Sequence, residues 1–227
     1  NNRSNLYLIA LADSGTGKDH PRKVNFNIAF AAGMGACIGD AFASGEGLED
    51  ALFMHPSMLF QTDEIDSIFN TMKYNKDQRT ESMNEKLLKF YGAANSIYPL
   101  RRKALVKTRS NGEHEEIECI VNPNLVIFGT AIPKYFYEAM SRRVLENGLA
   151  ARCIEAGKRG RGKSQREIIP SDETLRAAKY IVNIDSMNGN LCSINPKPML
   201  VPDQPDATVL LEQIQHEFDD LVDFYKD

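Results

Sequence analysis

A strand, a glycine-containing loop and a helix follow one another directly near the start of the chain. Residues 6 to 12 are apolar and have the length of a buried strand. The next residues, Asp13 to Lys18, contain two glycines and end in a lysine, and apolar side chains then recur at helical spacing up to residue 32. This order predicts an α/β fold in which residues 5 to 12 form an interior strand of a mostly parallel sheet flanked by helices.

The loop between this strand and helix has the residue types of a phosphate-binding loop. Glycines let backbone N–H groups turn toward phosphate oxygens, the helix N-terminus adds positive potential, and a lysine can reach the outer phosphates. The pattern is incomplete, because Ala12 replaces the first glycine and Asp19 stands where a hydroxyl is expected. A tight turn with a solvated lysine is the competing interpretation. The candidate phosphate-binding residues are Ser14, Gly15, Thr16, Gly17, Lys18 and Asp19.

A second motif makes the nucleotide interpretation the stronger one. An apolar segment from residue 58 to 62 ends in the adjacent acids Asp63 and Glu64. In phosphate-loop enzymes a buried strand delivers an aspartate to magnesium, and a following glutamate can polarise the attacking water. We therefore predict ATP and Mg²⁺ as ligands. Asp63, with or without Asp19, is the candidate metal ligand, and Glu64 is the candidate for orienting water. A solvated acidic pair at a strand end is the alternative.

Two further residues are candidates for contacting the outermost phosphate. Thr130 closes the apolar strand predicted at residues 125 to 131, where it can sense a γ-phosphate. Arg152 lies in the strand predicted at residues 149 to 156, and it can neutralise charge in its own subunit or in a neighbouring one. Between these strands, Pro133 favours a helix with one apolar face through residue 144.

Two basic segments are candidate nucleic-acid contacts. Residues 98 to 121 predict a β-hairpin that turns at Asn111-Gly112 and carries cations on its first arm. The glutamates of the second arm offer an equally weighted account, in which cross-strand ion pairs merely hold the hairpin. Residues 157 to 166 form a basic, glycine-rich loop that can follow a strand or lie in solvent. The candidate nucleic-acid-binding residues are Arg101, Arg102, Lys103, Lys158, Arg159 and Arg161.

Composition limits the remaining possibilities. With 227 residues, of which 42% are hydrophobic, the chain can build one sizeable core with an appendage. We expect an ATPase core over residues 1–169 and a helical C-terminal extension over residues 170–227, both part of a longer protein. The polar stretch from residue 71 to 84 is expected to be a loop. The net charge of -4 argues against a protein coated in nucleic acid.

Cysteine spacing and hydropathy exclude other classes. The four cysteines are far apart, so neither a zinc site nor a redox pair is indicated. No apolar run approaches the ~20 residues that a membrane-spanning helix needs, and no signal peptide is recognisable. We therefore expect a cytoplasmic protein that does not associate with membranes.

The order of the motifs resembles a known family, the P-loop ATPase domains of phage and plasmid primase-helicase proteins. The order is more specific than any single motif, and it spans roughly the first three-quarters of the chain. The matching segments are S-G-T-G-K at 14 to 18, S-G-E-G-L at 44 to 48, D-E at 63 and 64, L-L-K-F-Y-G at 87 to 92, R-R-K at 101 to 103, G-T-A at 129 to 131 and N-G-L-A-A-R at 147 to 152.

This resemblance implies a RecA-like or replicative-helicase-like ATPase that acts on single-stranded DNA as a homo-oligomeric ring. It also implies that Arg152 acts across a subunit boundary, and that Glu46 is a second candidate for activating water beside Glu64. The first functional hypothesis is an ATP hydrolase, with a DNA helicase or primase-helicase role in translocating or remodelling DNA. The alternatives are a non-hydrolysing nucleotide-binding module, in which Asp19 marks lost catalysis, and a phage DNA-packaging ATPase.

Overall fold

The computed structural model of the chain describes residues 5–74, 78–100, 119–140, 142–157, 169–188 and 204–224. The chain divides into two compact units, Asn1–Lys197 and Pro198–Asp227, which are described separately. The sequence placed a domain boundary at residue 170 instead. The difference is helix α7 (Asp172–Asn188), which contacts α1 (Asp19–Ala31) within the first unit.

The first unit is built on a parallel sheet of five strands in the order β2-β3-β6-β1-β7. All four pairings between neighbouring strands are parallel. The strands are β1 (Leu6–Leu11), β2 (Ile38–Gly39), β3 (Ser57–Thr62), β6 (Asn124–Ala131) and β7 (Cys153–Gly157). The predicted α/β class with a mostly parallel sheet and flanking helices is thus confirmed, and β1 is an interior strand as expected.

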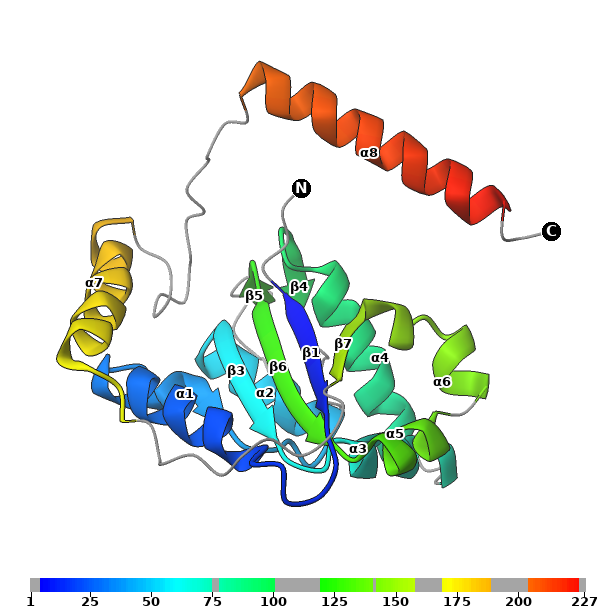
Figure 1. Cartoon of the computed structure of the whole chain (residues 1–227), viewed down its shortest axis with the longest axis horizontal. Helices are drawn as coiled ribbons and strands as arrows, with labels where there is room; N and C mark the ends of the chain where they lie inside the picture. Colours follow the sequence, from blue (N-terminus) through cyan, green and yellow to red (C-terminus); the bar gives the residue numbers. More distant parts are fainter. Residues whose placement is uncertain are drawn as a thin grey trace, which may run out of the picture. The chain divides into compact units, whose positions relative to one another are not determined.

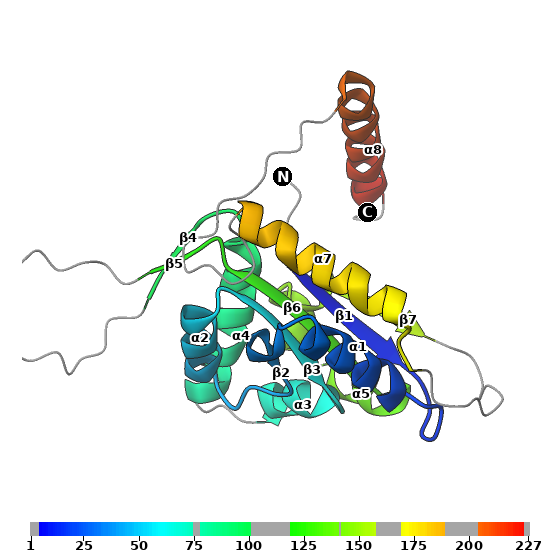
Figure 2. The same ribbon diagram turned by 90° about the vertical axis from the view of Figure 1, so that its left-hand side faces the viewer.

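Helices cover both faces of this sheet (Figures 1 and 2). Helices α1 and α7 lie over one face, with α7 running beside α1, and the remaining helices of the unit lie on the other face. The remaining helical segments are η1 (Gly35–Cys37), α2 (Gly45–Met54), α3 (Asp66–Tyr74), α4 (Gln78–Gly92), α5 (Pro133–Ala139), α6 (Arg142–Glu146) and η2 (Ala150–Arg152). Because the strands carry apolar side chains on both faces of the sheet, both faces need a covering layer of helices.

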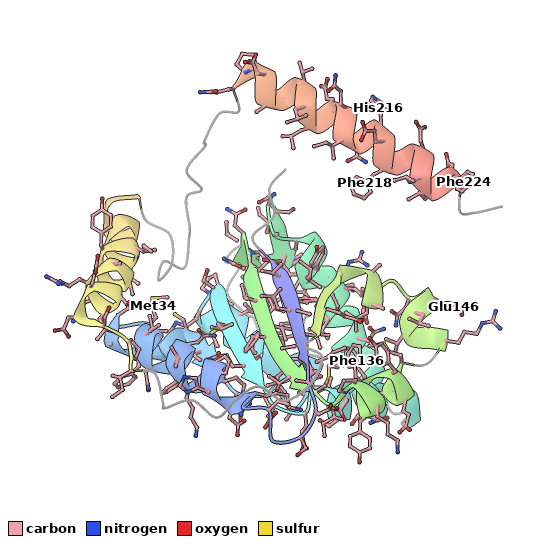
Figure 3. The ribbon with its side chains drawn as sticks, viewed as in Figure 1. Met34, Phe136, Glu146, His216, Phe218 and Phe224 are labelled. Carbon is pink, nitrogen blue, oxygen red and sulfur yellow. The ribbon has the colours of Figure 1, made fainter. Side chains whose placement is uncertain are left out.

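The main core lies between the sheet and helices α2 to α6. Tyr7, Ile9 and Leu11 alternate along β1 and are all buried, while the residues between them are only partly covered. On α5, Phe136 is fully buried and packs edge-on against Phe69 of α3, with ring centroids 5.7 Å apart (Figure 3). Pro133 opens α5 as predicted.

Two buried polar groups tie the layers together. The side chain of Asn5 donates to the carbonyl of Phe90 on α4 at 2.7 Å and accepts from the N–H of Leu125 on β6 at 3.1 Å. Lys86 on α4 forms a buried ion pair with Glu49 on α2 and donates to the hydroxyl of Tyr98 at 2.6 Å. Because buried charges need partners, this pair fixes α2 against α4.

The two ends of the predicted hairpin pair with each other. Strands β4 (Ile97–Pro99) and β5 (Cys119–Val121) are antiparallel, with Tyr98 opposite Ile120. The candidate cations Arg101, Arg102 and Lys103 fall between these strands in the sequence and lie outside the described residues. The other candidate cations, Lys158, Arg159 and Arg161, follow β7 and also lie outside the described residues. Their proposed contacts with nucleic acid therefore stay predictions.

The structure corrects two local expectations. The stretch from residue 71 to 84, expected to be a loop, continues α3 and begins α4, with residues 75–77 outside the described part. Many of its polar residues are good helix formers, so their polarity did not exclude a helix. The single helix expected after Pro133 is instead two short helices, because Met140 adopts an extended conformation between α5 and α6.

The second unit contains the helix α8 (Pro205–Phe224), whose residues are all exposed within the described structure. It lies in the stretch predicted to be a helical extension, and Leu210, Ile214, Phe218 and Leu221 form an apolar stripe along it. Among the described helices, none combines the length and the apolar character that crossing a membrane requires.

Candidate functional site

The parallel sheet brings three loops together at its C-terminal edge. Leu11 at the end of β1 pairs with Ala131 of β6, and Thr62 at the end of β3 pairs with Gly129 of β6. The arrowheads of β1, β3 and β6 accordingly lie at one edge, beside the loop that leads into α1 (Figure 1). In open α/β sheets, ligands bind at this edge.

The glycine loop, residues 12 to 18, has a backbone that requires its glycines. Gly15 has φ +74° and Gly17 has φ +84°, in the left-handed region that other residues avoid. A Cβ atom at either glycine would meet no atom within 4 Å, so backbone conformation rather than lack of space demands glycine there. The Thr16 hydroxyl donates to the Asp13 carbonyl at 2.7 Å, and Lys18 is the N-cap of α1. Within the described part of the chain, the N–H groups of residues 14 to 18 donate no hydrogen bond.

The acidic turn, residues 63 to 66, is held firmly against the end of β6. The N–H of Ile65 donates to the carbonyl of Thr130 at 3.0 Å. The Ile65 side chain lies over Gly129, where an added Cβ would approach its Cδ1 atom to 2.4 Å. Glu64 has φ +48°, a conformation uncommon for a residue with a side chain. A strained backbone of this kind persists only where surrounding contacts define it, and it often marks a functional position.

Replacing Gly129 with alanine is expected to displace this turn. The added methyl group overlaps Ile65, which is buried and linked by its own N–H to β6, so the turn must shift or the strand must bend. Overpacking of this kind costs about 1 to 3 kcal/mol of unfolding free energy. Denaturant unfolding of the Gly129→Ala protein measures this loss. The matched control is Gly92→Ala, where a Cβ meets nothing within 4 Å, and equal losses in the two variants would contradict the prediction.

Asp63 is the most highly connected acid of the turn. One carboxylate oxygen, Oδ1, accepts from the Thr130 hydroxyl at 2.5 Å and from the Glu64 N–H at 3.0 Å. The other, Oδ2, lies 3.5 Å from Arg22 on α1. Desolvation raises the pKa of Asp63, but the Thr130 hydrogen bond, the Arg22 charge, the Glu64 N–H and the Lys18 charge together outweigh it and leave the pKa below its ordinary value. Lys18 and the acidic turn are thus near enough to interact.

The lowered pKa of Asp63 predicts a pH-dependent contribution to stability. Since the folded pKa lies below the ordinary value of 3.8, Asp63 stabilises the fold above that pH and loses this contribution as pH falls through the folded pKa. The difference in unfolding free energy between the wild type and Asp63→Asn is therefore expected to move against the wild type from about pH 5 downward. Urea unfolding at a series of pH values measures it. A difference that is constant with pH would refute this assignment.

Sequence analysis missed Arg22, which lies at the centre of a charged cluster with Asp19, Asp40 and Asp63. Its guanidinium lies 3.2 Å from Asp19, 3.7 Å from Asp40 and 3.5 Å from Asp63. It also donates to the main-chain carbonyl of Gln61 at 3.3 Å. The spacing of Asp19 and Arg22, three residues apart on one helix, was the one available signal. The contacts with residues 40, 61 and 63, which lie in or directly after strands β2 and β3, were not visible in the sequence.

Asp66 was also missed. It begins α3, is almost fully buried, and its pKa is raised, chiefly by desolvation and then by the charges of Glu64 and Asp63, with Lys18 acting in the opposite direction. Because its pKa is affected by Lys18, Asp66 belongs to the same cluster. An acid two residues after the D-E pair was visible in the sequence, but its burial was not.

The remaining predicted residues have different placements. Glu64 is exposed beside Asp63, and Asp19 is exposed on the first turn of α1, paired with Arg22. Glu46 lies in the first turn of α2, whose N-cap Ser44 accepts from the Gly47 N–H at 3.0 Å. Ser44 thus caps α2, whereas a role for Glu46 toward water stays a prediction.

Arg152 lies away from the glycine loop. It precedes β7, where Cys153 pairs with Tyr7, whereas the loop follows Leu11, about 13 Å further along β1. Its guanidinium donates to the Gly148 carbonyl at 2.7 Å and faces the ring of Tyr91. The register therefore excludes a contact with a phosphate at the glycine loop of the same chain, and the role across a subunit boundary stays a prediction.

A cavity of about 490 Å³ opens beside the cluster, between α1 and the β2 edge of the sheet. Arg22, Asp40 and Gln61 form its wall toward the acidic turn, and Lys23 and Phe26 form the α1 side. The side chain of Gln61 bridges to α1 through the Arg22 carbonyl and Asn25, which keeps this wall in place.

The cluster suits a magnesium ion only in company with phosphates. In the described part of the chain, no group of three or more His, Cys, Asp or Glu side chains is arranged to hold a metal. Magnesium commonly uses one or two carboxylates together with substrate phosphates and water, so Asp63 at a strand end is a sufficient protein ligand.

The fold and the cluster define the class of the protein as an α/β protein with a five-stranded parallel sheet and a charged, glycine-containing C-terminal edge. No protein-family model matches the chain, and no curated protein matches it. The resemblance to primase-helicase ATPase domains accordingly depends on the motifs of the chain itself.

Proposed function

We propose that this chain is a P-loop ATPase of RecA-like type that binds ATP with Mg²⁺ at the C-terminal edge of the sheet. The observation that carries the proposal is the convergence of the glycine loop, Thr130 and Asp63, in which Lys18 contributes to the lowered pKa of Asp63. In the sequence, these groups are separated by up to 112 residues. Few structural reasons other than a shared ligand require a lysine, two left-handed glycines and an acidic turn at one edge.

Each residue has a defined task in this proposal. The backbone of Ser14 to Lys18 binds the phosphates, and Lys18 neutralises the β/γ charge. Asp63 holds magnesium, which when bound withdraws charge from the phosphate oxygens. Glu64 or Glu46 orients the attacking water. Thr130 anchors Asp63 and responds to the γ-phosphate.

The biological setting follows from the resemblance. We infer a phage or plasmid helicase or primase-helicase that couples hydrolysis to movement along single-stranded DNA. The same resemblance implies a homo-oligomeric ring, in which Arg152, remote from its own glycine loop, would contact the nucleotide of a neighbouring subunit. The basic residues 101 to 103 and 158 to 161 are the proposed DNA contacts.

The test is Mg²⁺-dependent ATP turnover by the purified chain, with and without single-stranded DNA. We expect turnover that requires Mg²⁺ and rises with DNA. Nucleotide binding is measured in parallel by calorimetry. If neither ATP nor ADP binds with a dissociation constant below the millimolar range, the proposed function is wrong.

One observation favours the alternative of a non-hydrolysing nucleotide-binding module. Asp19 replaces the hydroxyl expected after the loop lysine, and its carboxylate pairs with Arg22. Tight nucleotide binding without turnover, in the presence of DNA, would support this alternative. A DNA-packaging ATPase shares the same site and differs only in its DNA substrate.

A further inference from the structure

Arg22 lies against Oδ2 of Asp63, the carboxylate oxygen that Thr130 and the Glu64 N–H do not engage. Thr130 and the Glu64 N–H already engage Oδ1 of Asp63, so Oδ2 is the oxygen that faces the cluster. That oxygen lies 3.5 Å from an Nη atom of Arg22. The same Nη atom lies 3.2 Å from Asp19, and the other Nη atom lies 3.7 Å from Asp40 and donates to the Gln61 carbonyl.

The surroundings of Arg22 hold it in place but leave it able to turn. About one-fifth of its side chain is exposed, at 21%, while its carboxylate partners are 43% to 84% exposed. Its main chain is fixed, because it lies in α1 and its carbonyl accepts from the Gln61 side chain at 3.3 Å. The Nε atom is buried without a hydrogen-bond partner in the described structure, so the present contacts do not saturate the guanidinium.

We propose that Arg22 is a positioning residue that acts as the internal counter-ion of the site. Without nucleotide it neutralises Asp63 and keeps free divalent cations away from it. A magnesium ion held by phosphates would take the place of Arg22 at Oδ2 of Asp63, and Arg22 would remain paired with Asp19 and Asp40. Metal binding therefore depends on nucleotide binding. This inference rests on the proposed magnesium-nucleotide site.

Simple electrostatics supports this order of events. A guanidinium within about 4 Å of the metal position repels a divalent ion strongly in a partly buried site. A magnesium-nucleotide complex carries net negative charge, so the same cation attracts it. The proposal also gives Asp19 a role: it holds Arg22 beside the phosphates after Asp63 is released, which a serine or threonine at this position would not do.

Binding of Mn²⁺ alone, measured by electron paramagnetic resonance in the absence of nucleotide, tests the proposal. We expect Arg22→Gln to bind Mn²⁺ about tenfold more tightly than the wild type, or better, because a repelling charge is removed from the carboxylates. Arg22→Lys keeps the charge and is expected to remain close to the wild type. Arg142→Gln is the matched control, since Arg142 pairs with Glu146 on exposed α6. Adding Asp63→Asn to Arg22→Gln should abolish the gain.

A measurement on the wild-type protein covers the case in which Arg22→Gln does not fold. Paramagnetic broadening of the Glu64 amide signal by Mn²⁺ reports metal at Asp63 directly. We expect broadening with Mn²⁺ plus ATP, and none with the same concentration of Mn²⁺ alone.

Two results would overturn the inference. One is wild-type affinity for Mn²⁺ in a folded Arg22→Gln protein, and the other is broadening of the Glu64 amide by Mn²⁺ alone. Neither result depends on nucleotide binding. If nucleotide instead fails to bind, the calorimetric test above shows that the proposed function has failed.

Discussion

Alanine in place of Lys18 is expected to lower ATP turnover by about 100-fold or more, because one pre-organised cation at developing phosphate charge is commonly worth that much. Lys18 is the residue that joins the glycine loop to α1, and its charge contributes to the lowered pKa of Asp63. The Lys18→Ala change removes the only lysine of the loop and leaves the negative charge of the acidic turn less compensated. Turnover is measured with saturating Mg²⁺ and single-stranded DNA, and nucleotide affinity is measured by calorimetry.

Lys23→Ala is the matched control for this experiment. Lys23 lies on the same helix, is exposed, and lines the cavity rather than the loop. We expect it to keep most of the wild-type turnover, whereas Lys18→Ala loses both turnover and nucleotide affinity. Hydrolysis by Lys18→Ala at the wild-type rate would remove this lysine from the mechanism. A similar loss in both variants would point to general electrostatic attraction instead.

The largest effect on stability is expected for Lys86→Met. Lys86 and Glu49 form an ion pair in which both residues are 7% exposed, and Tyr98 hydrogen-bonds to both. Methionine fills the space of the lysine stem but leaves the Glu49 carboxylate without its cation. Breaking a buried pair from one side costs about 3 to 5 kcal/mol of unfolding free energy. Guanidinium chloride unfolding measures the loss.

Two companion variants identify the cause of this loss. Lys89→Met removes an exposed lysine one turn later that pairs with Glu85, and its effect should stay within about 0.5 kcal/mol. The double variant Lys86→Met with Glu49→Gln removes both charges, so it should be more stable than Lys86→Met alone. If the double variant loses as much unfolding free energy as Lys86→Met and Glu49→Gln lose together when measured singly, packing and not the unpaired charge is responsible.

Much of the fold was predictable because its signals are local. The apolar strand before the glycine loop, the Ser44 cap of α2 and Pro133 at the start of α5 each reflect contacts within a few residues. The prediction of a loop at residues 71 to 84 was wrong, and it too was based on a local signal, the polarity of the stretch. Polar residues that form helices well are hard to tell from a loop when few apolar residues are present to show a helical period.

The candidate site was predictable only in part. The types and order of its residues indicated a glycine loop and an acidic strand end, and parallel strands necessarily carry such ends to the same edge. Arg22 and Asp66 have no distinctive sequence pattern. Arg22 is recognisable only by its contacts with Asp40 and Asp63, which directly follow strands β2 and β3, and Asp66 only by its burial.

The sequence by itself determined which stretches become interior strands and which loop needs glycine, since these depend on apolar runs and on backbone conformation. Tertiary structure decided which charges meet. The register of β1, β3 and β6 brings Asp63 to Thr130 and Arg22, and the register of β7 carries Arg152 to the opposite edge. The reason is physical: electrostatic interactions depend on distances in space, and sheet order and register set those distances.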